Sequence, residues 1–115
     1  MGSQTILAPI LPGKLQAWKG FASELGGAKK AAFAEFNQRY GLTRHSAYLQ
    51  ATPDGGQFTI ALLEGPGAAE MLPKVARSEV GFDAWFRQNL ADIHGFDFTK
   101  PPPVGPGELL IDWRG

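Results

Sequence analysis

Tyr48 and Gln50 are the side chains of this sequence best suited to binding a small molecule. They stand two positions apart in an apolar and β-branched stretch, so on a β-strand they project from the same face. A phenol and a carboxamide both form hydrogen bonds and also present apolar bulk, which suits a ligand with one polar end. Contact with a second copy of the chain explains the same pair equally well.

Arg87 and His94 are a second candidate pair. They lie seven positions apart, which places them about two turns apart on one side of a helix, where they could hold an acidic substrate. Surface charge and capping of the helix end by His94 are the alternatives. Asp97 could orient the His94 ring. Asp112 would be a general base if it faced a dry cavity, where burial raises the pKa of a carboxyl, and would only solubilise an edge if it faced water.

The sequence assigns no catalytic residue, and we expect no metal site and no cofactor. The absence of cysteine excludes disulfides, thiolate zinc sites, iron–sulfur clusters and cysteine nucleophiles. The two histidines, His45 and His94, lack the local spacing of metal ligands, and we expect His45 to form an ion pair with Glu64 across a strand edge. Either histidine could be an axial haem ligand, but aromatic stripes at helical spacing are usually core. The glycine pairs match no nucleotide-binding pattern.

The chain's composition is that of one globular domain. Its 115 residues suffice for a single domain, which we place at residues 4–115, with residues 1–3 either a cloning remnant or a disordered start. The 11 basic residues balance the 11 acidic ones, so nucleic acid is not an expected partner. Apolar runs stay far below the ~20 residues that a membrane span needs, and the start lacks a signal-peptide pattern. We expect no membrane contact and a cytoplasmic location.

The order of predicted elements indicates an α+β fold. Asp54-Gly55 between two β-rich runs predicts a hairpin, and Gly95 ends an aromatic helical stripe. Proline crowding predicts an extended connection over Pro101–Pro106, whose path is left open. The expected elements are a strand at 5–10 buried on both faces, one bent or two short helices at 14–40 with a break at 26–27, strands at 44–51 and 57–64, a helix start at 66, a helix at 82–94 and a last strand at 109–113.

A hairpin loop of even length would put His45 and Leu49 on the apolar face with Phe58 and Ile60. Tyr48 and Gln50 would then lie on the opposite, half-covered face.

This order is that of the ferredoxin-like βαββαβ fold, in which both helices cover one face of a four-stranded antiparallel sheet. The other face stays open and part-apolar, which implies a partner. We expect a homodimer in which two open sheet faces pack together and enclose a cavity for a small apolar ligand, forming a dimeric α/β barrel.

Four stretches carry a resemblance to a known superfamily. They are RHSAYLQ at 44–50, PDGGQFTIALLEG at 53–65, FDAWFR at 82–87 and IHGFD at 93–97. The chain from 42 to 97 resembles uncharacterised bacterial proteins of the dimeric α/β-barrel, ferredoxin-like superfamily, which includes antibiotic-biosynthesis monooxygenases and stress-responsive barrel proteins. For an enzyme, the resemblance implies a cofactor-independent oxygenase or isomerase. The alternative is a non-enzymatic structural or ligand-sensing dimer, and fold analogy does not choose between them.

Overall fold

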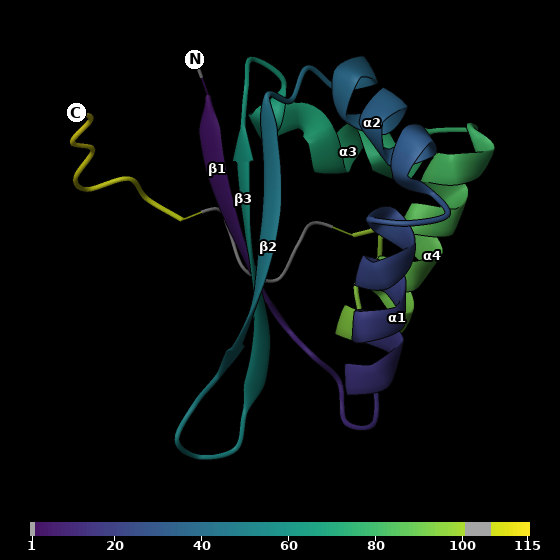
Figure 1. The fold of residues 1–115 in the computed structure, drawn as a ribbon, viewed down its shortest axis with the longest axis vertical. Coiled ribbons are helices and arrows are strands. Elements are labelled where there is room, and N and C mark those ends of the chain that lie inside the picture. The colour runs from purple at the N-terminus through teal and green to yellow at the C-terminus, as the bar shows by residue number, and fades with distance from the viewer. Residues whose placement is uncertain (1, 101–106) are drawn as a thin grey trace.

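The protein is described by a computed structural model that covers residues 2–100 and 107–115. A three-stranded antiparallel sheet in the order β1-β3-β2 carries all its helices on one face (Figure 1). Within the described residues, no helix is long and apolar enough to cross a membrane. The elements in chain order are β1 (Ser3–Pro9), α1 (Leu15–Leu25), α2 (Lys30–Arg39), β2 (Arg44–Ala51), β3 (Gln57–Glu64), the 3-10 turn η1 (Ala68–Glu70), α3 (Met71–Arg77) and α4 (Gly81–His94).

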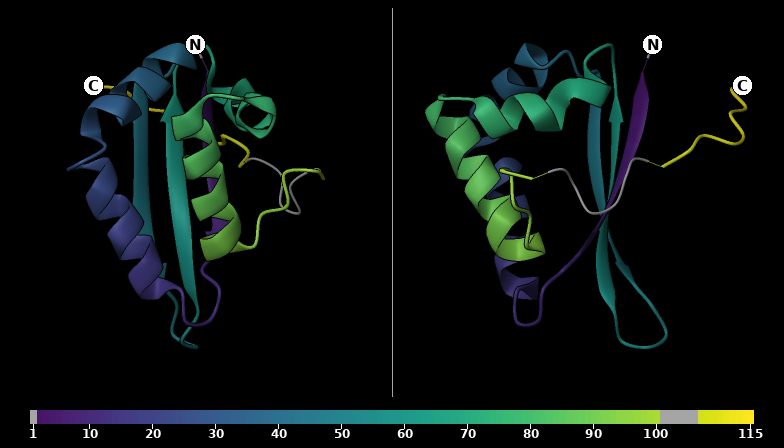
Figure 2. Two further views of the ribbon diagram at one scale, coloured as in Figure 1. Left: turned by 90° about the vertical axis from the view of Figure 1, so that its right-hand side faces the viewer. Right: turned by 180° about the vertical axis from the view of Figure 1, so that it is seen from behind.

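The predicted four-stranded ferredoxin-like sheet is wrong, although the fold is a mixed α+β one. Residues 109–113 form no strand, and Leu110 and Ile111 are more than 80% exposed. Just before this stretch, Gly107 N donates a hydrogen bond to Thr5 O of β1 at 3.4 Å. Apolar composition indicates a strand only if the chain also offers a layer to bury it, and the helices of this chain cover β1, β3 and β2 alone (Figure 2). The barrel that needed the fourth strand is therefore not formed as predicted. The extended connection predicted over Pro101–Pro106 lies outside the described residues.

The β2–β3 hairpin has the predicted strands but not the predicted faces. Residues 52 to 56 lie between the paired Ala51 and Gln57, so the loop has an odd length. Each pair across the hairpin therefore joins two odd-numbered or two even-numbered residues. Tyr48 thus pairs with Ile60, and Phe58, Ile60 and Leu62 of β3 point away from the helices, whereas Leu63 points toward them. The helix side of the sheet carries Gln4, Ile6, Ala8, His45, Ala47, Leu49, Thr59, Ala61 and Leu63. The open side carries Thr5, Leu7, Pro9, Ser46, Tyr48, Gln50, Phe58, Ile60 and Leu62.

β1 is half-buried rather than buried on both faces as expected. Its exposure alternates along the strand, with Leu7 exposed and Ala8 buried. This alternation follows from the missing second layer, because only the helix side of the sheet is covered. The strand also begins at Ser3, and Gly2 O accepts a hydrogen bond from Gly65 N at 2.9 Å.

The core lies between the helix side of the sheet and the helical layer. The rings of Phe36 of α2 and Phe86 of α4 pack against each other at an angle of 33°, with centroids 4.7 Å apart, and both are buried. The predicted helical stretch at 14–40 is two helices, α1 and α2, because Gly26 and Gly27 separate them. Gly95 adopts φ +74 and ends α4, as predicted.

Two glycines allow the chain after β3 to pass directly against the end of α2. A Cβ on Gly65 would lie 2.2 Å from the backbone oxygen of Gly41, and a Cβ on Gly67 would lie 1.8 Å from that of Tyr40. Both distances are far below van der Waals contact, so no larger residue fits without moving the backbone. This contact sets where η1 and α3 begin, and these elements form one wall of the pocket described below.

Candidate ligand-binding site

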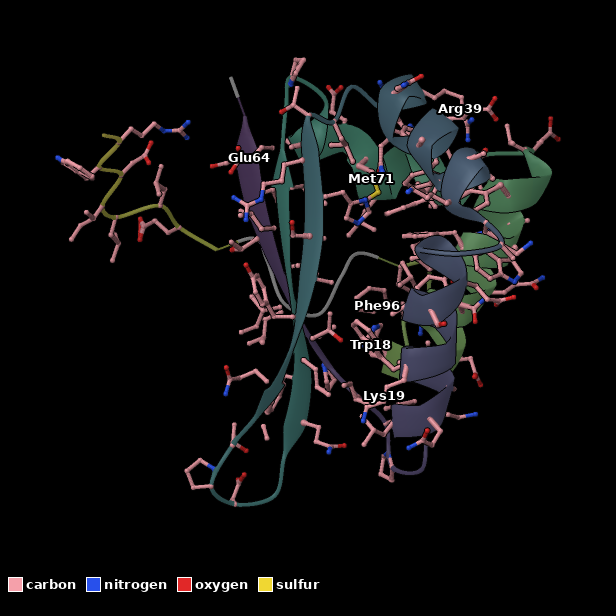
Figure 3. The ribbon with its side chains drawn as sticks, in the orientation of Figure 1. Trp18, Lys19, Arg39, Glu64, Met71 and Phe96 are labelled. Carbon is pink, nitrogen blue, oxygen red and sulfur yellow. The ribbon has the colours of Figure 1, made fainter. Side chains whose placement is uncertain are left out.

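A pocket of about 800 Å³ lies at the β1 edge of the sheet, on the helix side. One wall is the sheet itself, through Ile6 and Leu63, and a second is the turn and helix η1–α3. The third is the segment that follows α4, and Figure 3 shows Phe96 of that segment between the sheet and the helices. The volume is in the range of about 300–1,000 Å³ that small-molecule sites occupy.

Small side chains on η1 and α3 leave this space open. Ala68, Ala69 and Ala76 line the pocket together with Leu72 and Pro73. An alanine fills little of the gap between a helix and a sheet, so successive alanines at this contact leave volume that larger side chains would occupy. The opposite wall is aromatic, since Phe96 and Phe98 meet edge to face with centroids 5.9 Å apart. The interior is therefore mainly apolar.

Arg77 gives the pocket a cation. It is the last residue of α3, and within residues 2–100 and 107–115 the structure shows no ion pair for its guanidinium. The second cation at the pocket, Lys100, lies 3.9 Å from the Asp97 carboxylate. Arg77 is thus the basic group at this site that is available to an anionic ligand.

Asp97 stabilises the segment after α4 rather than acting as a base. Its carboxylate accepts hydrogen bonds from the Thr99 hydroxyl and from the Thr99 backbone N–H, the latter at 2.9 Å. Both bonds hold the pKa of Asp97 below its usual range, and the bond from the Thr99 hydroxyl has the larger effect. The group is ionised at neutral pH and is a weak proton acceptor.

Tyr48, Gln50 and Asp112 do not line the pocket. Tyr48 and Gln50 lie on the open side of the sheet, the face opposite the pocket, and Gln50 Nε2 donates to the Ala51 carbonyl at 2.9 Å. Asp112 lies in the exposed C-terminal segment, 3.3 Å from the Arg114 guanidinium. Strand alternation correctly predicts that Tyr48 and Gln50 share a face, but it does not report which face borders a cavity, and the predicted last strand that would have carried Asp112 is not formed.

Arg87 and His94 do not converge on an anion site. The Arg87 guanidinium donates to the carbonyl oxygens of Val75 and Ser78, which ties the end of α3 to α4. His94 is buried, and its Nδ1 lies 2.9 Å from the Pro9 carbonyl oxygen, a bond that only a protonated Nδ1 can make. Burial lowers the pKa of His94, although the bond to Pro9 opposes this shift. The predicted contact with Asp97 is not formed, since Asp97 bonds Thr99 instead.

His45 is a core residue and not the predicted edge ion pair. Arg44 takes that place, with its Nη1 3.6 Å from a Glu64 carboxylate oxygen. The His45 ring lies on the helix side of the sheet, 5.0 Å from the Phe33 ring. Desolvation lowers the pKa of His45 to about 4, so the ring is neutral at physiological pH. His45 lies on the predicted helix side, and the odd loop length of the hairpin, which sets its register, puts Leu63 rather than Glu64 beside it.

The sequence analysis missed two features of the structure, the residues that form the pocket and a buried carboxylate. The alanines of η1–α3 carry no motif, and the pocket exists only because this segment packs against the segment after α4. The second is Asp83, which is fully buried and accepts hydrogen bonds from Arg39, Tyr40 and Ser78. Its place in the first turn of a helix is a favourable one for a carboxylate and was the available signal.

In the described part of the chain, no three histidine, aspartate or glutamate side chains are grouped to hold a metal ion. Comparisons with protein-family models, curated proteins and solved structures found no match to this chain. The resemblance to the dimeric α/β-barrel superfamily therefore stays a prediction from the sequence, and the pocket is the starting point for a function.

Proposed function

We propose that the protein binds a small, mainly apolar molecule with one anionic group, such as a medium-chain carboxylate, in the pocket at the β1 edge. The observation that carries this proposal is the position of Arg77, a guanidinium without an ion partner among the described residues, beside an apolar pocket. A carboxylate pairs well with a guanidinium because two parallel hydrogen bonds can form. The apolar body of the ligand would contact Leu72 and Phe96.

We favour binding over catalysis because Asp97, the carboxylate that lines the pocket, is engaged in hydrogen bonds within the protein. Its partners are the hydroxyl and the backbone N–H of Thr99. An oxygenase or isomerase needs a base free to take a proton from its substrate. The function that these contacts support is a carrier or a sensor of the ligand. The cytoplasmic location predicted from the sequence stays a prediction.

Binding of decanoate, measured by isothermal titration calorimetry, tests this proposal. The neutral analogue 1-decanol has the same apolar body without the charge. Arg77→Gln should weaken decanoate binding about three- to tenfold, as expected for a partly exposed ion pair, and should leave 1-decanol binding unchanged. Lys74→Gln is the matched control, since Lys74 lies on the same helix, pairs with Glu70 and does not line the pocket.

Equal loss of decanoate affinity in the two variants would show that general surface charge, and not Arg77, attracts the anion. Absence of heat with both decanoate and 1-decanol at two well-separated temperatures would contradict the proposed ligand class, because burial of apolar surface makes the binding enthalpy depend on temperature.

A further inference from the structure

Gln4 is a polar side chain of the pocket that the proposed function leaves unused. It lies on β1, an edge strand of the sheet, and pairs in register with Leu63 of β3. Both residues face the helix side of the sheet, and both line the pocket. Gln4 is half-buried there. Its carboxamide therefore belongs to the sheet wall of the pocket.

The other polar side chains of the pocket are already engaged or assigned. The polar lining residues are Gln4, Arg77, Asp97, Thr99 and Lys100. Thr99 and Lys100 both contact the Asp97 carboxylate, so these three side chains hold one another. Arg77 is assigned to the anionic group of the ligand. Within residues 2–100 and 107–115, the Gln4 side chain has no hydrogen-bond partner.

The Gln4 amide reaches open space. In the part of the chain that the structure describes, no side-chain nitrogen or oxygen is both buried and without a hydrogen-bond partner. An amide that has no partner there is therefore accessible, and the space that Gln4 borders on the helix side of the sheet is the pocket. A carboxamide offers two N–H donors and one oxygen acceptor, so it can bind a small polar group of a ligand.

Gln4 and Arg77 lie at opposite ends of η1–α3. The start of η1 lies against the start of β1, since a Cβ on Gly2 would be 3.9 Å from the Ala68 Cβ. From there the helix runs away from the sheet toward α4, and Arg77 is its last residue (Figure 2). With a rise of about 1.5 Å per residue, the seven residues of α3 are about 10 Å long. The pocket therefore has a polar group at each end, with Leu72 of α3 between them.

We propose that Gln4 binds a hydroxyl or oxo group at the end of the ligand remote from its anionic group, so that the ligand is an acid with a polar group at each end of an apolar chain. This inference rests on the anion binding proposed above. A hydroxyl would donate to Gln4 Oε1 and accept from Nε2, whereas an oxo group would accept from Nε2. A few polar groups at fixed places in an apolar pocket select among ligands of similar size. Gln4 is thus a specificity-determining residue, and Arg77 recognises the charge.

Three acids that differ only in one hydroxyl test where the second polar group binds. They are decanoate, 10-hydroxydecanoate, whose hydroxyl is at the far end of the chain, and 3-hydroxydecanoate, whose hydroxyl is close to the carboxylate. Isothermal titration calorimetry of the natural chain should show that 10-hydroxydecanoate binds about three- to tenfold more tightly than the other two acids. This is the gain expected from one hydrogen bond that replaces bonds to water.

Gln4→Leu should remove this preference. Leucine has a similar size but no amide, so the affinity for 10-hydroxydecanoate should fall about three- to tenfold, while the affinity for decanoate should stay within about twofold. Gln50→Leu is the matched control, because Gln50 lies on the open side of the same sheet and does not line the pocket. That variant should keep the preference. Thermal unfolding shows whether both variants are folded, and the comparison of the three acids on the natural chain does not depend on either variant.

The outcomes separate this inference from the proposed function. Decanoate binding that depends on Arg77, together with equal affinities for the three acids, would overturn the role of Gln4 and leave the anion site standing. A preference for 10-hydroxydecanoate that persists in Gln4→Leu would also overturn it, because another group would then bind the hydroxyl. A preference for 3-hydroxydecanoate would place the second polar contact beside Arg77 and not at Gln4. Failure of all three acids to bind, at the two temperatures used for decanoate, would overturn both proposals.

Discussion

His45 Nδ1 lies 2.8 Å from the Asn37 side-chain oxygen. Because an amide oxygen only accepts hydrogen bonds, Nδ1 carries the proton and the neutral ring keeps its lone pair on Nε2. The bond joins β2 to α2, where the His45 ring also packs beside the rings of Phe33 and Phe36. A neutral histidine is therefore a structural part of this core.

Acid should destabilise the protein through His45. Its pKa is about 4 in the folded protein against 6.5 in the unfolded chain, so between these values the unfolded chain binds the extra proton. The free energy of unfolding should then fall by about 3 kcal/mol from this group as the pH drops from neutral to about 4. Urea denaturation across this pH range measures the change.

The His45→Phe variant separates this effect from that of other groups. His94 also has a lowered pKa and contributes with the same sign, and carboxylates add to the loss below about pH 5. The difference between the natural chain and His45→Phe isolates His45. The same pH dependence in both proteins would show that His45 is not the group responsible.

Asp83→Asn should be strongly destabilising. The carboxylate is fully buried and accepts hydrogen bonds from Arg39, Tyr40 and Ser78, so an amide would leave at least one donor without an acceptor and the Arg39 charge unpaired. We expect a loss of about 3 kcal/mol in the free energy of unfolding. Asp92→Asn on the same helix is the control. It breaks an exposed pair with Lys14 and should cost less than about 1 kcal/mol. Similar losses in both variants would contradict this assignment.

Gly65→Ala should prevent the close approach of the chain after β3 to the end of α2. The added Cβ would meet the Gly41 carbonyl oxygen at 2.2 Å, and φ of +134 disfavours any other residue. Several kcal/mol of destabilisation are expected, which thermal unfolding measures. Gly20→Ala is the opposite case, because that position in α1 has open space around it and should gain roughly 0.5–1 kcal/mol of stability. An unchanged melting temperature in Gly65→Ala would contradict the close contact.

Ala76→Phe tests whether the pocket is open. If the space beside Ala76 is free, the larger side chain should enter it, block decanoate binding and leave the free energy of unfolding within about 1 kcal/mol of the natural value. If the space is filled, the substitution should overpack the core and cost more, about 1–3 kcal/mol. Calorimetric titration and urea denaturation of the same variant distinguish the two results.

Much of the fold could be predicted from short-range patterns. Asp54-Gly55 defined the hairpin to the residue, and Gly95 marked the end of α4, since both signals depend on backbone conformations that few residue types favour. The predicted pairing of faces in the hairpin was wrong because it depends on whether the loop has an odd or an even number of residues, and an even number was expected. Tyr48 keeps its predicted open side, but Phe58 and Ile60 exchange sides with Thr59 and Ala61.

The C-terminal strand and the candidate site could not be predicted in the same way. Ile111 and its neighbours have the composition of a strand, but pairing depends on an edge and a covering layer that no local pattern reports. The pocket results from alanines of η1–α3 meeting Phe96 from a distant part of the chain. The predicted side of His45 agrees with the structure, but its predicted partner Glu64 does not, because the environment of His45 is made by α2 and α4, which the sequence around it does not describe.

The hairpin loop has a consequence for how this gene can vary. A single-codon insertion or deletion between Thr52 and Gly56 changes an odd loop into an even one, and every side chain of one strand then turns to the other face unless a bulge absorbs the change. His45 would be moved into water, or Phe58, Ile60 and Leu62 into the space under the helices. Loop length in homologous genes should therefore change by two codons at a time, even though Pro53, Asp54 and Gly55 are exposed.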